Sequence, residues 1–242
     1  MTATLTPPPV EGWLTDAQAF RLAAAARRVP AGERIVEIGS FRGKSTIVLA
    51  RAAPDGVDVV AIDPHLGVDR APQETSEDAD VGQSDFEQFT ANLAAHGVAD
   101  RVTHVRRKAE EALGDVPGEL AVLYVDGAHS YRFAHFDITA WGDRVARGGT
   151  MLVHDSFSSI GVTLALLKVT FLGRKWRYVG RSTSMAEFRR EDLSTAAWLG
   201  NLGRQAAQLP WFARNVLVKA LIVAKLRPVA RLLGHTSGPW PY

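Results

Sequence analysis

Two short polar segments carry residues whose types and spacing could support catalysis. Asp126 and His129 stand three positions apart after one apolar run, and His154 and Asp155 directly follow a second apolar run. If both runs are parallel strands joined by one helix, a right-handed crossover brings their ends to the same edge of the sheet. The two carboxylates could then share a divalent cation, and magnesium is expected because it prefers oxygen ligands. His129 could accept a proton beside it.

A second candidate site is the glycine-containing stretch EIGSFRGKST at residues 37–46. It is one residue too short for a phosphate-binding P-loop, and Phe41 occupies the second-glycine position of a dinucleotide fingerprint. Glu37 could instead pair with a cationic amino group, and Asp63, after the next apolar run, could accept hydrogen bonds from both hydroxyls of a ribose. A nucleoside without a phosphate chain is therefore expected, and S-adenosylmethionine fits. The alternatives are a ligand-free strand-to-helix corner at Gly39 and a helix-capping or turn-forming Asp63.

The elements that must position these residues alternate along the chain. Buried strands are predicted at 34–40, 57–63, 101–107, 119–127 and 150–156, and helices at 15–29, 43–53, 86–97 and 133–146. Thr15 can cap the first helix, with Gln18 three residues further on. A closing pair of strands follows at 175–180 and 184–190, the last one antiparallel. This order predicts an α/β fold: a Rossmann-like, doubly wound, mostly parallel seven-stranded sheet with helices on both faces, formed by residues 1–190. Residues 191–242 are expected to form a helical C-terminal extension.

Four segments together resemble a known superfamily. EIGSFRGKST, AIDPH, YVDGAHSY and ARGGTMLVHDSF occur in the order found in class I S-adenosylmethionine-dependent methyltransferases. Within that superfamily they are most similar to the metal-dependent sugar O-methyltransferases of macrolide and actinobacterial polysaccharide pathways, with cephalosporin-hydroxylase-like proteins as near relatives. The resemblance covers residues 11–188 and implies methyl transfer from S-adenosylmethionine to a hydroxyl of a sugar or glycosylated small molecule.

The resemblance also assigns roles to individual positions of the donor site. It implies that five residues line the methionine end of the donor, namely Glu37, Gly39, Ser40, Gly43 and Ser45. It places Asp63 at the ribose, and His65 and Ala109 near the ribose and adenine.

On the acceptor side, the resembling enzymes bind their metal with an aspartate after the fourth strand and an acidic pair after the fifth. Here these positions hold Asp126 and the pair His154-Asp155. A histidine nitrogen suits manganese, iron or zinc better than magnesium, so either the metal preference shifts or His154 is not a ligand. The spacing Asp126-x-x-His129 matches that of the general base in these relatives, with His154 as the competing base. Tyr131 could position the acceptor.

Other interpretations remain open. Asp126 and Asp155 could simply cap the helices that follow their strands. A hydroxylase-like relative on the same fold would need iron or a redox partner, and a non-catalytic module would bind the donor without turnover. The long polar insertion 66–84 is hypothesised to be a lid over the site.

Composition and charge limit the function classes further. The absence of cysteine excludes disulfides and thiolate catalysis, and no signal peptide or membrane-spanning run is evident, so a cytoplasmic protein is expected. From Arg189 onward there are eight Lys/Arg and two Asp/Glu, whereas the preceding residues have a net charge of −4, which disfavours nucleic acid as a partner. The basic, apolar tail could pack on the domain, form a homodimer, contact an anionic membrane peripherally or line a long acceptor, with Trp198, Trp211 and Phe212 as candidate membrane anchors.

Overall fold

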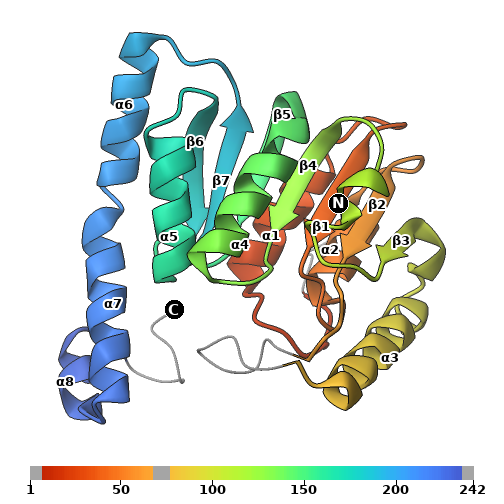
Figure 1. Cartoon of the computed structure of the whole chain (residues 1–242), viewed down its shortest axis with the longest axis horizontal. Coiled ribbons are helices and arrows are strands. Elements are labelled where there is room, and N and C mark those ends of the chain that lie inside the picture. The colour runs from red at the N-terminus through yellow and green to blue at the C-terminus, as the bar shows by residue number, and fades with distance from the viewer. Residues whose placement is uncertain (1–6, 68–76, 236–242) are drawn as a thin grey trace, which may run out of the picture.

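One seven-stranded sheet organises the chain (Figure 1). The computed structural model describes residues 7–67 and 77–235. The strand order is β3-β2-β1-β4-β5-β7-β6, and only β7 runs antiparallel to its neighbours β5 and β6. The predicted Rossmann-like sheet, including its antiparallel last strand, is therefore confirmed. The strands are β1 (Arg34–Ile38), β2 (Asp58–Ile62), β3 (Val102–Val105), β4 (Leu120–Val125), β5 (Val145–Val153), β6 (Trp176–Ser182) and β7 (Met185–Arg190).

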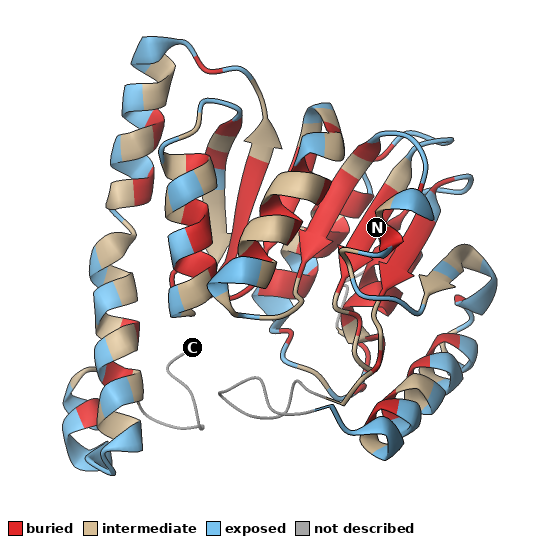
Figure 2. Cartoon of the chain, viewed as in Figure 1, coloured by how far each residue is buried: buried red, intermediate tan, exposed pale blue. Residues whose placement is uncertain are grey.

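Helices cover both faces of the sheet. One face packs against α1 (Asp16–Ala26), α2 (Lys44–Ala52) and α3 (Ala79–Ala95), and the other against α4 (Tyr131–Phe136) and α5 (Ile160–Leu166). The predicted first helix is confirmed with its capping box, in which Thr15 and Gln18 satisfy each other's backbone amides. The central strands are red along most of their length in Figure 2, because helices on both sides exclude water from them.

The topology places the carboxyl ends of β1 and β4 at the point where the strand order reverses. Ligands of doubly wound sheets bind in the crevice outside such a point. Alternation along the strands fixes which residues share a face: Ile35, Val122 and Leu152 pack in the core beneath α1 and α2. Glu37 lies two residues after Ile35, and Tyr124 two residues after Val122, so both are on this same face of the sheet. Asp126 and His154, the first residues after β4 and β5, follow Tyr124 and Leu152 at the same spacing.

Two helices differ from their predicted extents. The helix predicted at 86–97 begins at Ala79, with Asp78 as its cap, so part of the predicted polar insertion is helical. Residues 68–76 of the hypothesised lid lie outside the described residues. The helix predicted at 133–146 is α4 continued by a π-helical turn at Asp137–Trp141 and a 3-10 turn at Gly142–Arg144.

The C-terminal segment folds into three helices along the β6 edge: α6 (Thr195–Ala206), α7 (Leu209–Val223) and α8 (Arg227–Leu232). Trp211 and Phe212 of α7 pack against the core on the face that α4 and α5 cover. None of the helices in the described part of the chain has the length and apolar character needed to cross a membrane.

Candidate functional site

The donor side of the site is the turn between β1 and α2. Gly39 has φ +83°, and a Cβ at this position would lie 2.2 Å from the backbone oxygen of Asp126. Glycine is therefore required because the ends of β1 and β4 approach closely, which is a structural reason rather than a ligand contact. Gly43, with φ +85°, caps α2 in a left-handed conformation.

Asp63 supports this turn. Its Oδ2 accepts hydrogen bonds from the backbone amides of Ser40 and Phe41, both at 2.8 Å, and its Oδ1 accepts one from the amide of His65 at 2.8 Å. Asp63 and the glycine turn are therefore in direct contact. Three of the roughly four acceptor positions of a carboxylate are already used by the backbone, which leaves room for about one ribose hydroxyl.

Glu37 lies buried beneath the same turn. Its Oε2 accepts a hydrogen bond from the hydroxyl of Thr46, whereas Oε1 has no partner within the described residues. Burial raises the pKa of Glu37 to about 7, although the nearby hydroxyls of Ser45 and Thr46 oppose this shift. The Ser40 side chain is also buried, and its Oγ has no hydrogen-bond partner in this part of the chain.

His65 and Ala109 lie at the edge of this region. The His65 ring is buried, and its centre lies within 5.6 Å of the ring centres of Phe86, Phe89 and His104. Burial lowers the pKa of His65, so the neutral ring behaves as part of an apolar cluster beneath α3. Ala109 follows β3, and its carbonyl accepts a hydrogen bond from Trp141 Nε1 at 3.1 Å.

The acceptor side brings the four polar residues after β4 and β5 together. His129 Nε2 lies 2.8 Å from Asp155 Oδ2, and His154 Nδ1 lies 3.1 Å from Asp126 Oδ1 and 3.5 Å from Asp155 Oδ2. Burial opposes ionisation of Asp155, but His154 and His129 hold the pKa of that carboxyl well below its usual range. Asp155 is therefore an ionised partner for both rings. Tyr131 is exposed at the start of α4, with its ring 5.4 Å from that of His135.

The proton on His154 can be assigned from its neighbours. Oε1 of Gln18 accepts hydrogen bonds from the backbone amide and hydroxyl of Thr15, so its NH2 group is the part that faces His154 Nε2, at 3.1 Å. An NH2 group can only donate, which makes Nε2 the acceptor and leaves the ring proton on Nδ1, facing Asp126 and Asp155.

This arrangement does not fit a metal ligated by His154. A metal would need the Nδ1 lone pair, whereas this nitrogen carries the ring proton; it lies 3.1 Å from Asp126 Oδ1 and 3.5 Å from Asp155 Oδ2, without a hydrogen bond to either within the described residues. Ser156, an alternative oxygen ligand, donates its hydroxyl to Val153 O at 2.7 Å. Across residues 7–67 and 77–235, no three histidine, aspartate or glutamate side chains are grouped so that they could hold a metal ion.

Sequence reasoning missed three contributors to the site. Tyr124 donates its hydroxyl to Asp126 Oδ2 at 2.7 Å, and its position two residues earlier on the same face of β4 was the available signal. Gln18 was recognised only as a capping residue. Lys219 of α7 donates to Ser158 O at 3.1 Å, in the loop that follows Asp155, and nothing local in the sequence indicates this contact.

With this fold and site established, comparison with known proteins identifies the class. A family model described as a methyltransferase domain matches residues 36–156, which include both the donor turn and the acceptor-side residues. This match spans half of the chain. The protein therefore belongs to this methyltransferase domain family.

Solved structures support the same fold at low sequence identity. The O-methyltransferase TomG of Streptomyces achromogenes, involved in tomaymycin synthesis and solved with S-adenosylmethionine, is 23% identical with a TM-score of 0.52, over 73% of this chain and 79% of TomG. The S-adenosylhomocysteine-bound methyltransferase PaMTH1 of Podospora anserina is 18% identical with a TM-score of 0.56, over 74% and 80%. The O-methyltransferase NovP is 18% identical with a TM-score of 0.55, over 72% and 80%.

Proposed function

We propose that this protein transfers a methyl group from S-adenosylmethionine to a hydroxyl of a sugar or a glycosylated small molecule, with His129 as the general base. The observation that carries this proposal is the 2.8 Å contact between His129 Nε2 and Asp155 Oδ2 at the edge where β4 and β5 end. Membership of a methyltransferase domain family supports methyl transfer. Two solved proteins of this fold are O-methyltransferases bound to S-adenosylmethionine or to its product, which supports the donor and the type of acceptor.

The donor turn has groups that suit S-adenosylmethionine. Glu37 Oε1 and Ser40 Oγ are buried polar atoms without partners in the described chain, and an ammonium group could satisfy both. Asp63 retains acceptor capacity for a ribose hydroxyl. Bound there, the donor supplies a methyl group on a sulfonium, which is a good leaving group.

His129 and Asp155 activate the acceptor. Because Nε2 of His129 donates to the ionised Asp155, the neutral ring has its lone pair on Nδ1, and Asp155 stabilises the imidazolium that forms. The acceptor oxygen attacks the methyl carbon in line while its proton passes to His129. A new C–O bond forms, and the electrons of the broken C–S bond remain on sulfur.

Two features support a sugar as the acceptor: its hydroxyl needs a base, and the side chains around His129 are exposed to solvent. A sugar hydroxyl is a weak nucleophile near neutral pH, so it needs a base such as His129. The His129 side chain is 51% exposed, and Tyr131 is exposed beside it, which suits a bulky polar acceptor. The hydroxylase alternative depended on His154 as an iron ligand, and the proton on its Nδ1 speaks against that role.

The test is a kinetic comparison of variants in the presence of a panel of glycosides and labelled S-adenosylmethionine. His129→Ala should lower kcat by about 10²- to 10⁴-fold while calorimetric donor affinity stays within about twofold of wild type. His96→Ala, a histidine at the end of α3, is the matched control and should retain full activity. Unchanged turnover in His129→Ala would remove it as the base, and no donor binding at millimolar concentration would remove the methyltransferase function itself.

Metal dependence has a separate test. Because the protonated Nδ1 of His154 does not suit a metal ligand, we expect EDTA treatment to leave the transfer rate unchanged. Added Mg²⁺ or Mn²⁺ should raise the rate by less than about twofold. Loss of activity with EDTA and recovery with one cation would restore Asp126 and Asp155 as metal ligands.

A further inference from the structure

The outer side of the C-terminal helices exposes large apolar residues to water. Val223 is 75% exposed and Leu232 is 85% exposed, and four further large side chains are at least 44% exposed. Together they form what we call the outer tail face, made of Leu199, Leu217, Val223, Leu226, Val229 and Leu232. A solvent-facing helix surface is normally polar, so this face indicates a surface that is covered in use.

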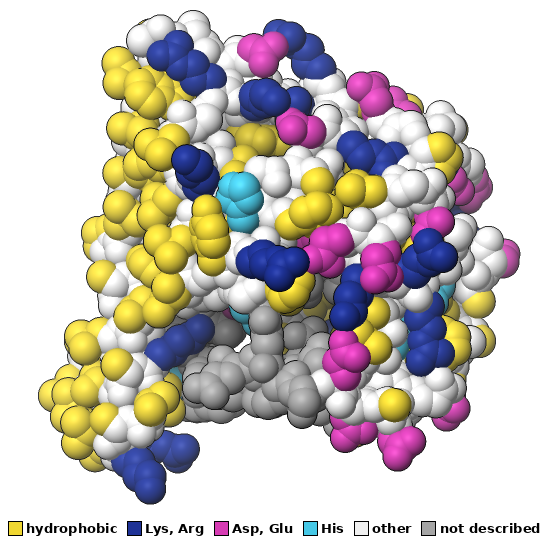
Figure 3. Space-filling model, in the orientation of Figure 1, with side chains coloured by type: hydrophobic (Ala, Val, Ile, Leu, Met, Phe, Trp, Pro, Cys, Tyr) yellow, Lys and Arg dark blue, Asp and Glu magenta, His cyan; other side chains and the backbone are white. Residues whose placement is uncertain are grey.

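The same region carries only positive charge. From Leu193 to the C-terminus the sequence has six Lys/Arg and no Asp/Glu. Lys225, Arg227 and Arg231 are exposed around the corner between α7 and α8, and within the described residues none of them has an acidic partner. Figure 3 shows hydrophobic side chains along the edge formed by these helices, with Lys/Arg at its lower end.

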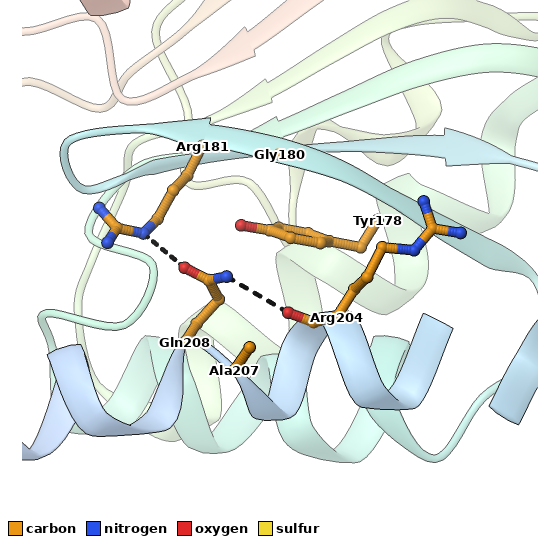
Figure 4. Close-up of a pocket in the computed structure, with 6 residues that line it drawn as sticks. All are labelled: Tyr178, Gly180, Arg181, Arg204, Ala207 and Gln208. Carbon is orange, nitrogen blue, oxygen red and sulfur yellow. Dashed lines mark hydrogen bonds between the residues drawn. The ribbon is translucent and has the colours of Figure 1, made fainter. Parts of the chain in front are cut away.

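A basic groove borders this face between β6 and α6. Figure 4 shows Arg181 and Arg204 in the groove with Tyr178 and Gln208. Arg181 is held in place by Gln208 Oε1 at 2.8 Å and lies 3.8 Å from the centre of the Trp211 ring. Arg181 Nη1 also donates to Thr183 O at 2.7 Å, so this guanidinium group is largely satisfied within the chain. The groove contains none of the predicted donor or acceptor residues, and its two arginines add positive charge beside the C-terminal helices.

The aromatic residues predicted to anchor in a membrane are half-buried against the domain. Trp198 donates its ring N–H to Phe171 O at 3.2 Å, and Trp211 and Phe212 pack against the core. They fix the helices on the domain and leave the aliphatic side chains outward. The face is thus a preformed surface and not a detached segment.

We propose that the outer tail face docks on an anionic phospholipid bilayer, lying in the interface without crossing it. Apolar side chains enter the boundary between headgroups and acyl chains, and the surrounding Lys/Arg contact lipid phosphates. A second copy of the chain is the less favourable occupant, because two such faces would bring like charges together. Docking is independent of the methyl transfer proposed above, since none of the six apolar residues belongs to the candidate site.

The experiment is vesicle flotation of the full chain. Vesicles of phosphatidylcholine and phosphatidylglycerol in a two-to-one ratio should bind the protein, and phosphatidylcholine alone should bind it at least about tenfold more weakly. The charge variant Lys225→Glu/Arg227→Glu/Arg231→Glu should lose at least about 30-fold in binding to the anionic vesicles. The apolar variant Val223→Ser/Leu232→Ser, at the two most exposed positions, should also lose at least about fivefold.

A matched control separates docking from general electrostatics. Arg27, Arg51 and Arg107 are exposed on the main body, and replacing all three with glutamate changes the net charge by the same amount. This control should bind within about twofold of wild type. Equal losses in the control and charge variants, or no binding to anionic vesicles, would overturn the proposal. A wild-type dimer in sedimentation velocity that becomes a monomer in Val223→Ser/Leu232→Ser would assign the face to a second copy instead.

Discussion

Glu37 is a buried carboxyl group whose charge depends on what binds beside it. Burial raises its pKa to about 7, so near neutral pH the ligand-free protein holds this group partly protonated. If the ammonium of the donor pairs with Glu37, binding favours the ionised form. Donor affinity should then fall by up to about tenfold per pH unit below about pH 7, because binding must first displace the proton.

Calorimetric titration at several pH values tests this linkage. Glu37→Gln should bind the donor at least about tenfold more weakly above neutral pH and should lose the pH dependence, since glutamine neither ionises nor neutralises an ammonium. The same steep dependence in Glu37→Gln would show that another group titrates. Thermal unfolding of the free variant at each pH controls for damage to the turn.

Among elements, the turn between β1 and α2 depends most sharply on one glycine. A Cβ at Gly39 would lie 2.2 Å from Asp126 O, and φ is +83°. Gly39→Ala therefore combines left-handed backbone strain with a clash that separates the ends of β1 and β4. We expect it to lower the free energy of unfolding by about 3 kcal/mol or more and to abolish donor binding.

Gly32→Ala is the matched control for backbone strain alone. Gly32 has φ +85°, but nothing lies within 4 Å of the added Cβ. Its cost should be about 1 kcal/mol, with donor binding intact. Equal destabilisation of the two variants in urea unfolding would mean that the close approach of Gly39 to Asp126 has no energetic importance.

Elements with strong periodicity were predictable, whereas their tertiary partners were not. Apolar runs predicted β1 to β4 and the second half of β5, and the spacing of Thr15 and Gln18 predicted the start of α1. β5 begins at Val145, five residues before the predicted start and inside the predicted helix 133–146. The second contact of Gln18, to His154, joins residues 136 positions apart, and no local pattern encodes it. For the same reason the proton on His154 Nδ1, which bears on the predicted metal at Asp126 and Asp155, could not be inferred from the sequence.

At the scale of the whole molecule, buried amides tie the C-terminal helices to the sheet. Asn201 is fully buried, where it accepts a hydrogen bond from the amide of Tyr178 at 2.7 Å and donates to Trp176 O at 3.0 Å. It thereby occupies backbone groups of the edge strand β6 that would otherwise be open to pairing with another chain. Asn215, also fully buried, donates to Phe157 O at 3.2 Å, next to the acceptor side of the site.

Because these contacts are buried and specific, the described chain should unfold as one cooperative unit despite the change of composition after residue 190. Calorimetry should give a single transition, with equal calorimetric and van't Hoff enthalpies. Asn201→Ala leaves two backbone groups of β6 without partners and should cost about 2 kcal/mol or more, lowering the midpoint of that whole transition. Gln83→Ala, an exposed polar residue on α3, should change it by less than about 0.5 kcal/mol. Two separate transitions, with only the smaller one shifted by Asn201→Ala, would instead make the C-terminal helices an independent unit carried by the methyltransferase domain.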